Sequence, residues 1–207
     1  MMDFKKYEFT LNCDNPDWTT DKRHVAIIYE FLMRADVKRV AELGSYTGFS
    51  TAAFIEALNN GKDFKLHLSE PRPTPQLKTV ISMCKKPDNV VLHTQCGVNF
   101  LEVWKDFDLV FVDADHSMVG AGADLLMLLK NEIRNVMAHD TNLNSMVSNY
   151  DGMGTELLGR VLKIHPDYKV IEDKEKRKNE FTERGFLFAS MDDDNYNIAK
   201  GVFEDLC

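Results

Sequence analysis

Two carboxylates and an imidazole follow an apolar run in the middle of the chain. The run, Phe107–Val112, has five apolar residues in six, and after it come Asp113, Asp115 and His116. Burying a charge without a partner costs several kcal/mol, so charged groups at the end of a buried strand indicate a functional site. An imidazole with an ordinary pKa of about 6.5 can accept a proton at neutral pH, which makes His116 a candidate general base. The alternative is a histidine satisfied by Ser117 or by a backbone carbonyl.

A second charged pair follows the next apolar run, at 133–138. The pair is His139 and Asp140. Because the tips of adjacent strands lie about 5 Å apart, Asp113 and Asp140 could hold a cation together. Carboxylate oxygens suit Mg²⁺, which keeps several waters and so leaves room for a substrate oxygen. Each carboxylate alone also fits a helix cap or a solvated surface, and His139 fits either a structural or a ligand role.

Two glycines flank a tight turn after an earlier apolar run, at 37–43. The sequence from Glu42 to Ser50 is ELGSYTGFS. Gly44 lets the backbone approach a ligand closely, and Gly48 opens a helix whose amino terminus favours a carboxylate or phosphate. Glu70 follows the next predicted strand and is placed to accept hydrogen bonds from both hydroxyls of a ribose. The G-x-x-x-G spacing is neither the dinucleotide fingerprint nor the P-loop, so the turn alone does not name its ligand.

Strands and helices alternate along the chain and set where these residues lie. Apolar runs predict strands at 37–43, 64–68, 90–94, 107–112, 133–138, 168–172 and 185–190. Helical spacing predicts helices over 49–58, 76–85, 121–129 and 154–164, and an earlier one after the cap residues Thr19, Thr20 and Asp21. The fold class is therefore α/β: a Rossmann-like, seven-stranded, mostly parallel sheet with one antiparallel strand and helices on both faces. Such sheets bind ligands at the carboxyl ends of their strands.

Composition narrows the classes of partner. The 207 residues include 25 Lys+Arg and 33 Asp+Glu, a net charge of −8 that disfavours nucleic acid and anionic membranes. The four cysteines show no C-x-x-C spacing, and no stretch approaches the ~20 apolar residues of a membrane span. We expect a cytoplasmic protein. Residues 1–18 are expected to form a lid or dimer arm before a domain at 19–207, which leaves a homo-oligomer open.

The glycine turn and the following acid resemble those of class I S-adenosylmethionine-dependent methyltransferases, in the small-molecule O-methyltransferase branch. In that family, a strand ending in E-x-G-x-x-x-G binds the methionine end of S-adenosylmethionine (SAM), and an acid after the second strand binds the ribose. The resemblance covers roughly residues 20–190. It implies a cofactor site made of Glu42, Gly44, Ser45, Gly48, Phe49, Ser50, Glu70, Gly97, Val98 and Asp113, with Gly97 and Val98 beside the adenine.

The acids after the fourth and fifth strands resemble those of the metal-dependent members. The resemblance implies a metal ion, Mg²⁺, on Asp113, His139 and Asp140, with Asp113 and His116 as catalytic residues. The catechol and caffeoyl-CoA type has Lys at the position of His116 and Asn at that of Thr141. The sequence is closer to the macrolide sugar O-methyltransferases and the cephalosporin-hydroxylase-like group, in which an acidic residue usually stands at the position of His139.

The function that follows is methyl transfer from SAM to a hydroxyl group of a small molecule, assisted by a divalent metal. Two alternatives stay open: a metal-independent enzyme or N-methyltransferase on the same fold, and a non-catalytic domain that binds an adenosyl ligand. The Asn- and Ser-rich segment 141–152 is either a substrate cover or a surface connection.

Overall fold

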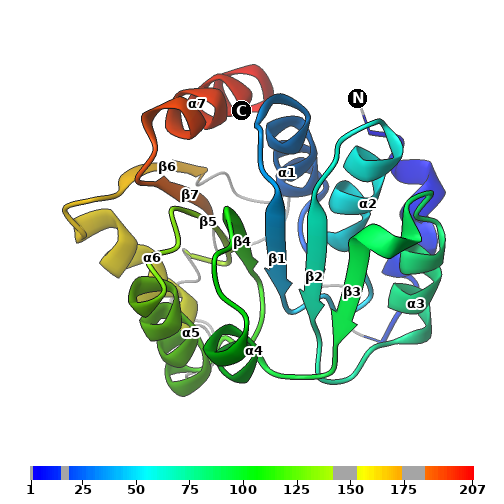
Figure 1. Cartoon of the computed structure of the whole chain (residues 1–207), viewed down its shortest axis with the longest axis horizontal. Coiled ribbons are helices and arrows are strands. Elements are labelled where there is room, and N and C mark those ends of the chain that lie inside the picture. Colours follow the sequence, from blue (N-terminus) through cyan, green and yellow to red (C-terminus); the bar gives the residue numbers. More distant parts are fainter. Residues whose placement is uncertain (1, 15–18, 142–152, 174–184) are drawn as a thin grey trace.

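The computed structural model describes residues 2–14, 19–141, 153–173 and 185–207. The apolar runs form one sheet with the strand order β3-β2-β1-β4-β5-β7-β6 (Figure 1). Five strands are parallel: β1 (Arg39–Leu43), β2 (Lys65–Ser69), β3 (Val90–His93), β4 (Leu109–Val112) and β5 (Asn135–His139). Strand β7 (Phe186–Ser190) runs antiparallel to both β5 and β6 (Lys169–Asp173). The predicted fold class is confirmed, and the antiparallel strand lies between β5 and β6.

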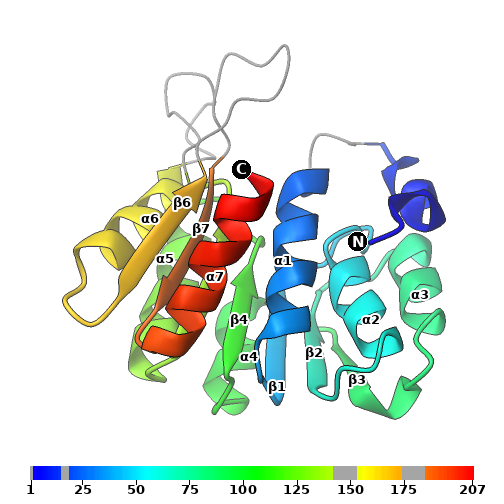
Figure 2. The ribbon, with the colours of Figure 1, turned by 90° about the horizontal axis from the view of Figure 1, so that it is seen from above.

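Helices cover both faces of the sheet (Figures 1 and 2). One layer contains α1 (Lys22–Arg34), α2 (Thr51–Asn59), α3 (Pro75–Ser82) and α7 (Asp193–Leu206), and the other contains α4 (Gly97–Val103), α5 (Met118–Lys130) and α6 (Met153–Ile164). Successive side chains of a strand point to opposite faces. In β4, Leu109 and Phe111 therefore enter one core, and Val110 and Val112 enter the other. This double burial explains why the run is apolar throughout.

Two α-helices, α4 and α7, were not among the elements predicted from the sequence. Helix α4 is short, and the first turn of α7 lies within an acidic triplet, 192–194, that indicates solvated surface in the sequence. In the structure Asp192 caps α7, because its side chain accepts a hydrogen bond from the backbone N–H of Asn195 at 2.9 Å. The buried residues Ala199, Val202 and Phe203 dock this helix beside α1.

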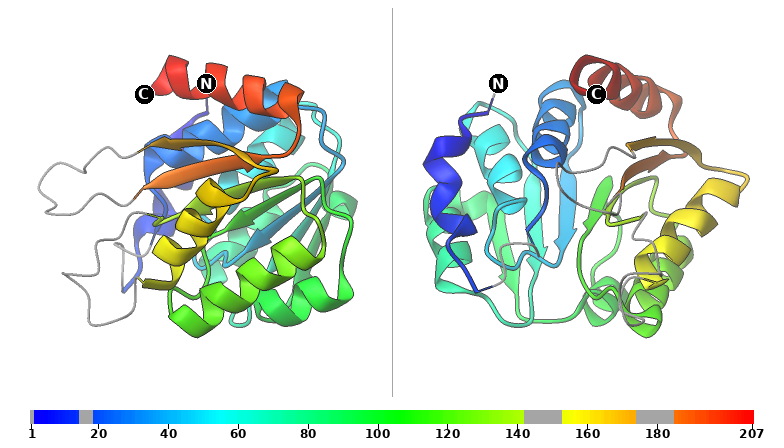
Figure 3. Two further views of the ribbon diagram at one scale, coloured as in Figure 1. Left: turned by 90° about the vertical axis from the view of Figure 1, so that its left-hand side faces the viewer. Right: turned by 180° about the vertical axis from the view of Figure 1, so that it is seen from behind.

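The N-terminal segment packs on the domain through a 3-10 helix, Phe4–Leu11, beside α3 (Figure 3). Tyr7 is fully buried, and its hydroxyl donates a hydrogen bond to Glu56 of α2 at 2.7 Å. Burial and the Glu56 carboxylate raise the pKa of that hydroxyl. Lys6 pairs with the same carboxylate at 2.8 Å. The role of this segment as a lid or dimer arm stays a prediction.

Replacing Tyr7 with Phe should lower the free energy of unfolding by about 1–2 kcal/mol, because a hydrogen bond to a charged acceptor is lost while the ring stays in place. Urea denaturation measures this. Tyr196→Phe is the control, since Lys169 contacts the Tyr196 ring rather than its hydroxyl. Equal losses in the two variants would contradict the assignment.

Across the part of the chain that the structure describes, no helix combines the length and the apolar character needed to cross a membrane.

Candidate active site

The turn after β1 packs tightly against the end of β4. Gly44 has a φ of +81°, and a Cβ placed on it would lie 2.2 Å from the carbonyl oxygen of Asp113. Its backbone N–H donates to the Ser69 carbonyl at the end of β2. Tyr46 and Gly48 also have positive φ angles, 43° and 89°. The glycine pattern is therefore required by the backbone path and by the neighbouring strand, because only glycine fits the Gly44 position.

Glu42 lies beneath this turn, and its carboxylate is hydrogen-bonded to side chains of the turn and of the start of α2. It is fully buried and accepts hydrogen bonds from the hydroxyls of Ser45, Ser50 and Thr51 at 2.9, 2.6 and 2.6 Å. Burial raises the pKa of Glu42 to about 7, although the three hydroxyls oppose the shift. These contacts brace the turn from below. Direct contact of Glu42 with a cofactor stays a prediction.

The raised pKa of Glu42 makes stability depend on pH. The ordinary value is 4.5, so the folded state holds the proton more tightly than the unfolded state between pH 4.5 and about 7. The free energy of unfolding therefore falls as pH rises through this window, by about 3 kcal/mol. Denaturation of the wild type and Glu42→Gln at pH 5 and pH 8 should show this difference. Glu204→Gln is the control, because Glu204 is exposed. If the free energy of unfolding differed between the wild type and Glu42→Gln by the same amount at both pH values, the assignment would be contradicted.

Glu70 reaches from the end of β2 to the turn after β1. Its Oε2 accepts the backbone N–H groups of Ser45 at 3.2 Å and Tyr46 at 2.9 Å, and its Oε1 accepts that of Arg72 at 2.9 Å. The side chain is half-buried. A carboxylate has about four acceptor positions, so Glu70 can hold the turn and still accept from a ligand.

An open pocket lies beside this turn. Its walls are the glycine turn, the tip of β4 and the segment before α1, and its lining residues are Thr19, Thr20, Gly44, Ser45, Tyr46, Thr47, Phe49, Ser50 and Asp113. The pocket therefore brings together five of the residues predicted to bind the cofactor.

The other predicted cofactor residues lie outside this lining. Gly48 packs against Leu77 of α3, at 3.2 Å from the position of a Cβ. Gly97 begins α4 with the Asp124 carboxylate against it, and Val98 packs on the adjoining core. Burial raises the pKa of Asp124 to about 7, and the Asp115 charge adds to this shift.

Asp113 is the contact point between the pocket and a cluster of titratable groups. Its Oδ2 accepts the hydroxyl of Thr20 at 2.7 Å, and its Oδ1 lies 3.5 Å from both His116 Nε2 and His139 Nδ1. Burial alone would raise the pKa of Asp113, but His139 and His116 lower it well below its ordinary value. Asp115 is apart, since it accepts the N–H of Ser117 at 2.9 Å.

His139 and Asp140 complete this cluster at the end of β5. His139 is 1% exposed, and its Nδ1 lies 3.3 Å from Asp140 Oδ1. Burial would lower the pKa of His139, but Asp140 and Asp113 raise it well above its ordinary value. Burial likewise opposes protonation of His116, whose Nε2 lies 3.6 Å from Asp140 Oδ2, yet Asp113 and Asp140 raise its pKa.

The structure brings the three predicted metal ligands together. One ligand atom from each of Asp113, His139 and Asp140 lies within 4.8 Å of the others. Asp140 has a φ of 57°, a left-handed conformation that Asp tolerates better than most residues.

Three residues next to this cluster were not predicted from the sequence to be site residues. Thr20 donates to Asp113, and Asp21 and His24 face His139. The sequence reading treated Thr20 and Asp21 only as helix caps. The available signal was the spacing of Asp21 and His24, which places an acid and an imidazole on one side of the first helical turn.

This seven-stranded sheet is the fold of several solved methyltransferase structures. A family model described as a methyltransferase domain matches residues 41–138. No curated protein sequence matches the chain. The resemblance inferred from the sequence is confirmed by the matched domain and by solved structures of this fold.

Three of these structures cover most of both chains. The O-methyltransferase TomG from Streptomyces achromogenes, in complex with SAM, has a TM-score of 0.73 at 17% identity and covers 92% of this chain and 90% of its own. A Bacillus cereus O-methyltransferase with S-adenosylhomocysteine (SAH) has a TM-score of 0.73 at 15% identity, covering 92% and 91%. SAH-bound PaMTH1 from Podospora anserina has a TM-score of 0.70 at 18% identity, covering 91% and 87%.

Proposed function

We propose that the chain is a SAM-dependent methyltransferase that methylates a hydroxyl group of a small molecule, assisted by a divalent metal ion. One observation carries this proposal: Glu70 is fixed on the glycine turn beside a pocket whose wall includes Asp113, the centre of the acid and histidine cluster. The net charge of −8 supports a small-molecule acceptor over a nucleic acid.

The groups around the pocket support binding of a positively charged nucleoside. Bound SAM supplies a methyl group on a sulfonium. Glu70 would accept the ribose hydroxyls with its remaining acceptor positions, and the backbone of the glycine turn, from Gly44 onward, lines the pocket for close approach. The Asp113 carboxylate would provide a negative potential that attracts the cationic end.

His116 is the proposed general base. Its side chain is 30% exposed, so an acceptor can reach it, and a hydroxyl is a poor nucleophile until its proton is removed. The imidazole would take that proton, and Asp113 and Asp140, at 3.5 and 3.6 Å from Nε2, would stabilise the imidazolium that forms.

Asp113, His139 and Asp140 are the proposed ligands of the divalent ion. Their donor atoms are close enough to share one ion, and the two carboxylates suit Mg²⁺. Such an ion would lower the pKa of an acceptor hydroxyl and orient it.

The burial of His139 between Asp113 and Asp140 favours a second candidate, a metal-independent methyltransferase. A protonated imidazole there would supply positive charge beside both carboxylates. The two candidates separate on treatment with EDTA, which stops only the metal-assisted enzyme.

Calorimetry with SAH tests the cofactor site. The wild type should bind SAH, and Glu70→Gln should bind it about 10- to 100-fold more weakly, because charged hydrogen bonds to the ribose are lost. Glu204→Gln, at an exposed position of α7, should bind like the wild type. A wild type that binds neither SAM nor SAH would overturn the proposed function.

A further inference from the structure

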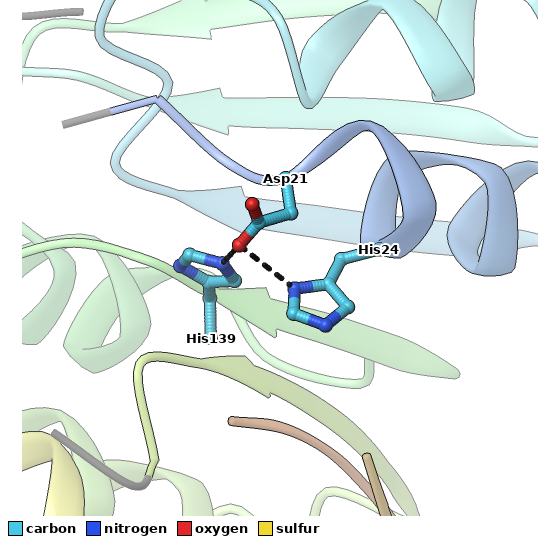
Figure 4. A group of neighbouring side chains, drawn as sticks. All are labelled: Asp21, His24 and His139. Carbon is cyan, nitrogen blue, oxygen red and sulfur yellow. Dashed lines mark ion pairs between the residues drawn. The ribbon is translucent and has the colours of Figure 1, made fainter. Parts of the chain in front are cut away.

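A second group of ligand atoms lies between the start of α1 and the end of β5. The Asp21 carboxylate points toward the rings of His24 and His139 (Figure 4). Its Oδ2 lies 3.5 Å from His24 Nδ1 and 3.5 Å from His139 Nε2. Both histidines are buried, with 3% and 1% of their surfaces exposed. Water is therefore largely excluded from the polar atoms of the two rings.

The distances suit metal ligands better than hydrogen bonds. Within the described parts of the chain, neither His24 Nδ1 nor His139 Nε2 has a hydrogen-bond partner. Ligands at about 2.0–2.1 Å from a tetrahedral ion lie about 3.3 Å from one another, close to the two 3.5 Å separations from Asp21 Oδ2. The two rings meet edge to face, with centroids 5.2 Å apart and planes at 69°.

The outer contact of His24 fixes which nitrogen is available. His24 Nε2 lies 3.1 Å from Asp173 Oδ2 at the end of β6. Because a carboxylate only accepts, Nε2 carries the proton of the neutral ring and Nδ1 presents its lone pair to Asp21. Two acceptors facing each other repel unless a cation lies between them. A carboxylate that holds the far nitrogen of a histidine is the usual outer partner of a metal-binding imidazole.

The charges around the group also favour a cation. Asp113 and Asp140 face the opposite edge of His139, and Asp173 faces His24. Arg23 forms an ion pair with Asp173. The three carboxylates around the group therefore carry more negative charge than this one guanidinium neutralises.

We propose that Asp21, His24 Nδ1 and His139 Nε2 form a binding site for a transition metal ion such as Zn²⁺, with one coordination position left for water or a ligand. Two imidazoles and a carboxylate are typical donors for such an ion. The ion would tie the start of α1 to the end of β5, next to the pocket wall at Thr19 and Thr20. This site shares His139 with the ion site proposed above, but its argument does not depend on methyl transfer.

The proposed site uses the nitrogen of His139 that the cation at Asp113 and Asp140 does not. A ring bound to Zn²⁺ through Nε2 would keep its proton on Nδ1, which would then donate toward Asp140. With Zn²⁺ bound, His139 would therefore no longer be a ligand of the ion at Asp113 and Asp140, and those two residues would hold that ion with oxygen atoms alone, as Mg²⁺ prefers.

The test is titration of the metal-free full chain with Zn²⁺, followed by calorimetry, and with Co²⁺, followed by visible absorption. We expect one Zn²⁺ per chain and the absorption bands of tetrahedral Co²⁺. His24→Gln and Asp21→Asn should each weaken Zn²⁺ binding by about 100-fold or more. His165→Gln, which alters a different Asp–His pair, should bind like the wild type.

The proposed site would be overturned if the wild type bound no Zn²⁺. It would also be overturned if both variants still bound Zn²⁺ while Asp140→Asn did not. A Co²⁺–thiolate absorption band would place the ion on a cysteine and would overturn the site as well. Circular dichroism shows whether each variant is folded. If His24→Gln misfolds, Asp21→Asn still tests the site, because Asn is also suited to the N-cap position. SAH binding measured on the same samples keeps failure of this site distinct from failure of the proposed function.

Discussion

Replacing His116 with Gln should lower the rate of methyl transfer by about 100- to 10,000-fold, the range lost with a positioned general base. The physical reason is that Gln cannot take up the proton of the acceptor hydroxyl. Because His116 lies outside the lining of the predicted cofactor pocket, the affinity for SAH should be unchanged. Asp113 and Asp140 would remain in place in the variant, so the effect would isolate the imidazole.

Formation of SAH measures the rate, with an acceptor found by screening hydroxylated small molecules. His165→Gln is the matched control, because the His165 side chain is 28% exposed against 30% for His116 and also pairs with an aspartate. Activity of His116→Gln close to that of the wild type would show that another group removes the proton.

Replacing Gly44 with Ala should destabilise the chain by about 2–5 kcal/mol. A left-handed backbone costs about 1–2 kcal/mol in a residue with a side chain, and overpacking adds about 1–3 kcal/mol. Both conditions hold at Gly44, whose φ is +81° and whose Cβ would lie 2.2 Å from backbone oxygen. Since the obstacle is the backbone of Asp113, the β4 tip would have to move, and SAH binding should be lost with it.

Denaturant unfolding measures the loss, and the chain contains a control that separates its two causes. Gly61 has a φ of +99°, but among the described residues no atom beyond its two chain neighbours lies within 4 Å of the position of its Cβ. Gly61→Ala should therefore cost only the conformational part, about 1–2 kcal/mol. Similar losses at the two positions would show that the contact with β4 is relieved by small shifts.

The sequence supported the predictions that depend on order along the chain. Alternating apolar runs define the strands, and in a parallel sheet the residues after successive strands gather at one edge. Asp113 and Asp140 are close for this reason, since they follow the adjacent strands β4 and β5. Glu70 meets the glycine turn because β2 lies next to β1. Helix α7 was missed because its charged first turn resembles a solvated loop.

Order along the chain did not predict which groups Glu42 and His139 contact. Glu42 matches a cofactor motif in the sequence, and in the structure its carboxylate accepts hydrogen bonds from three hydroxyls of the turn and of the start of α2. His139 is next to Asp140 in the sequence, and in the structure it also lies between Asp113, after β4, and Asp21, before α1.

By itself the sequence determined the class of fold, the strand ends that carry the chemistry and the likeness to SAM-dependent methyltransferases, because periodicity and motif spacing are local properties. Only the tertiary structure decided which groups Glu42 and His139 contact, and that Asp21 and His24 join His139. The contacts of Asp21 and His24 with His139 depend on how α1 packs on the sheet, where Phe31 contacts Phe188. This packing is set by the complementary shapes of two buried surfaces, which no single segment of the sequence specifies.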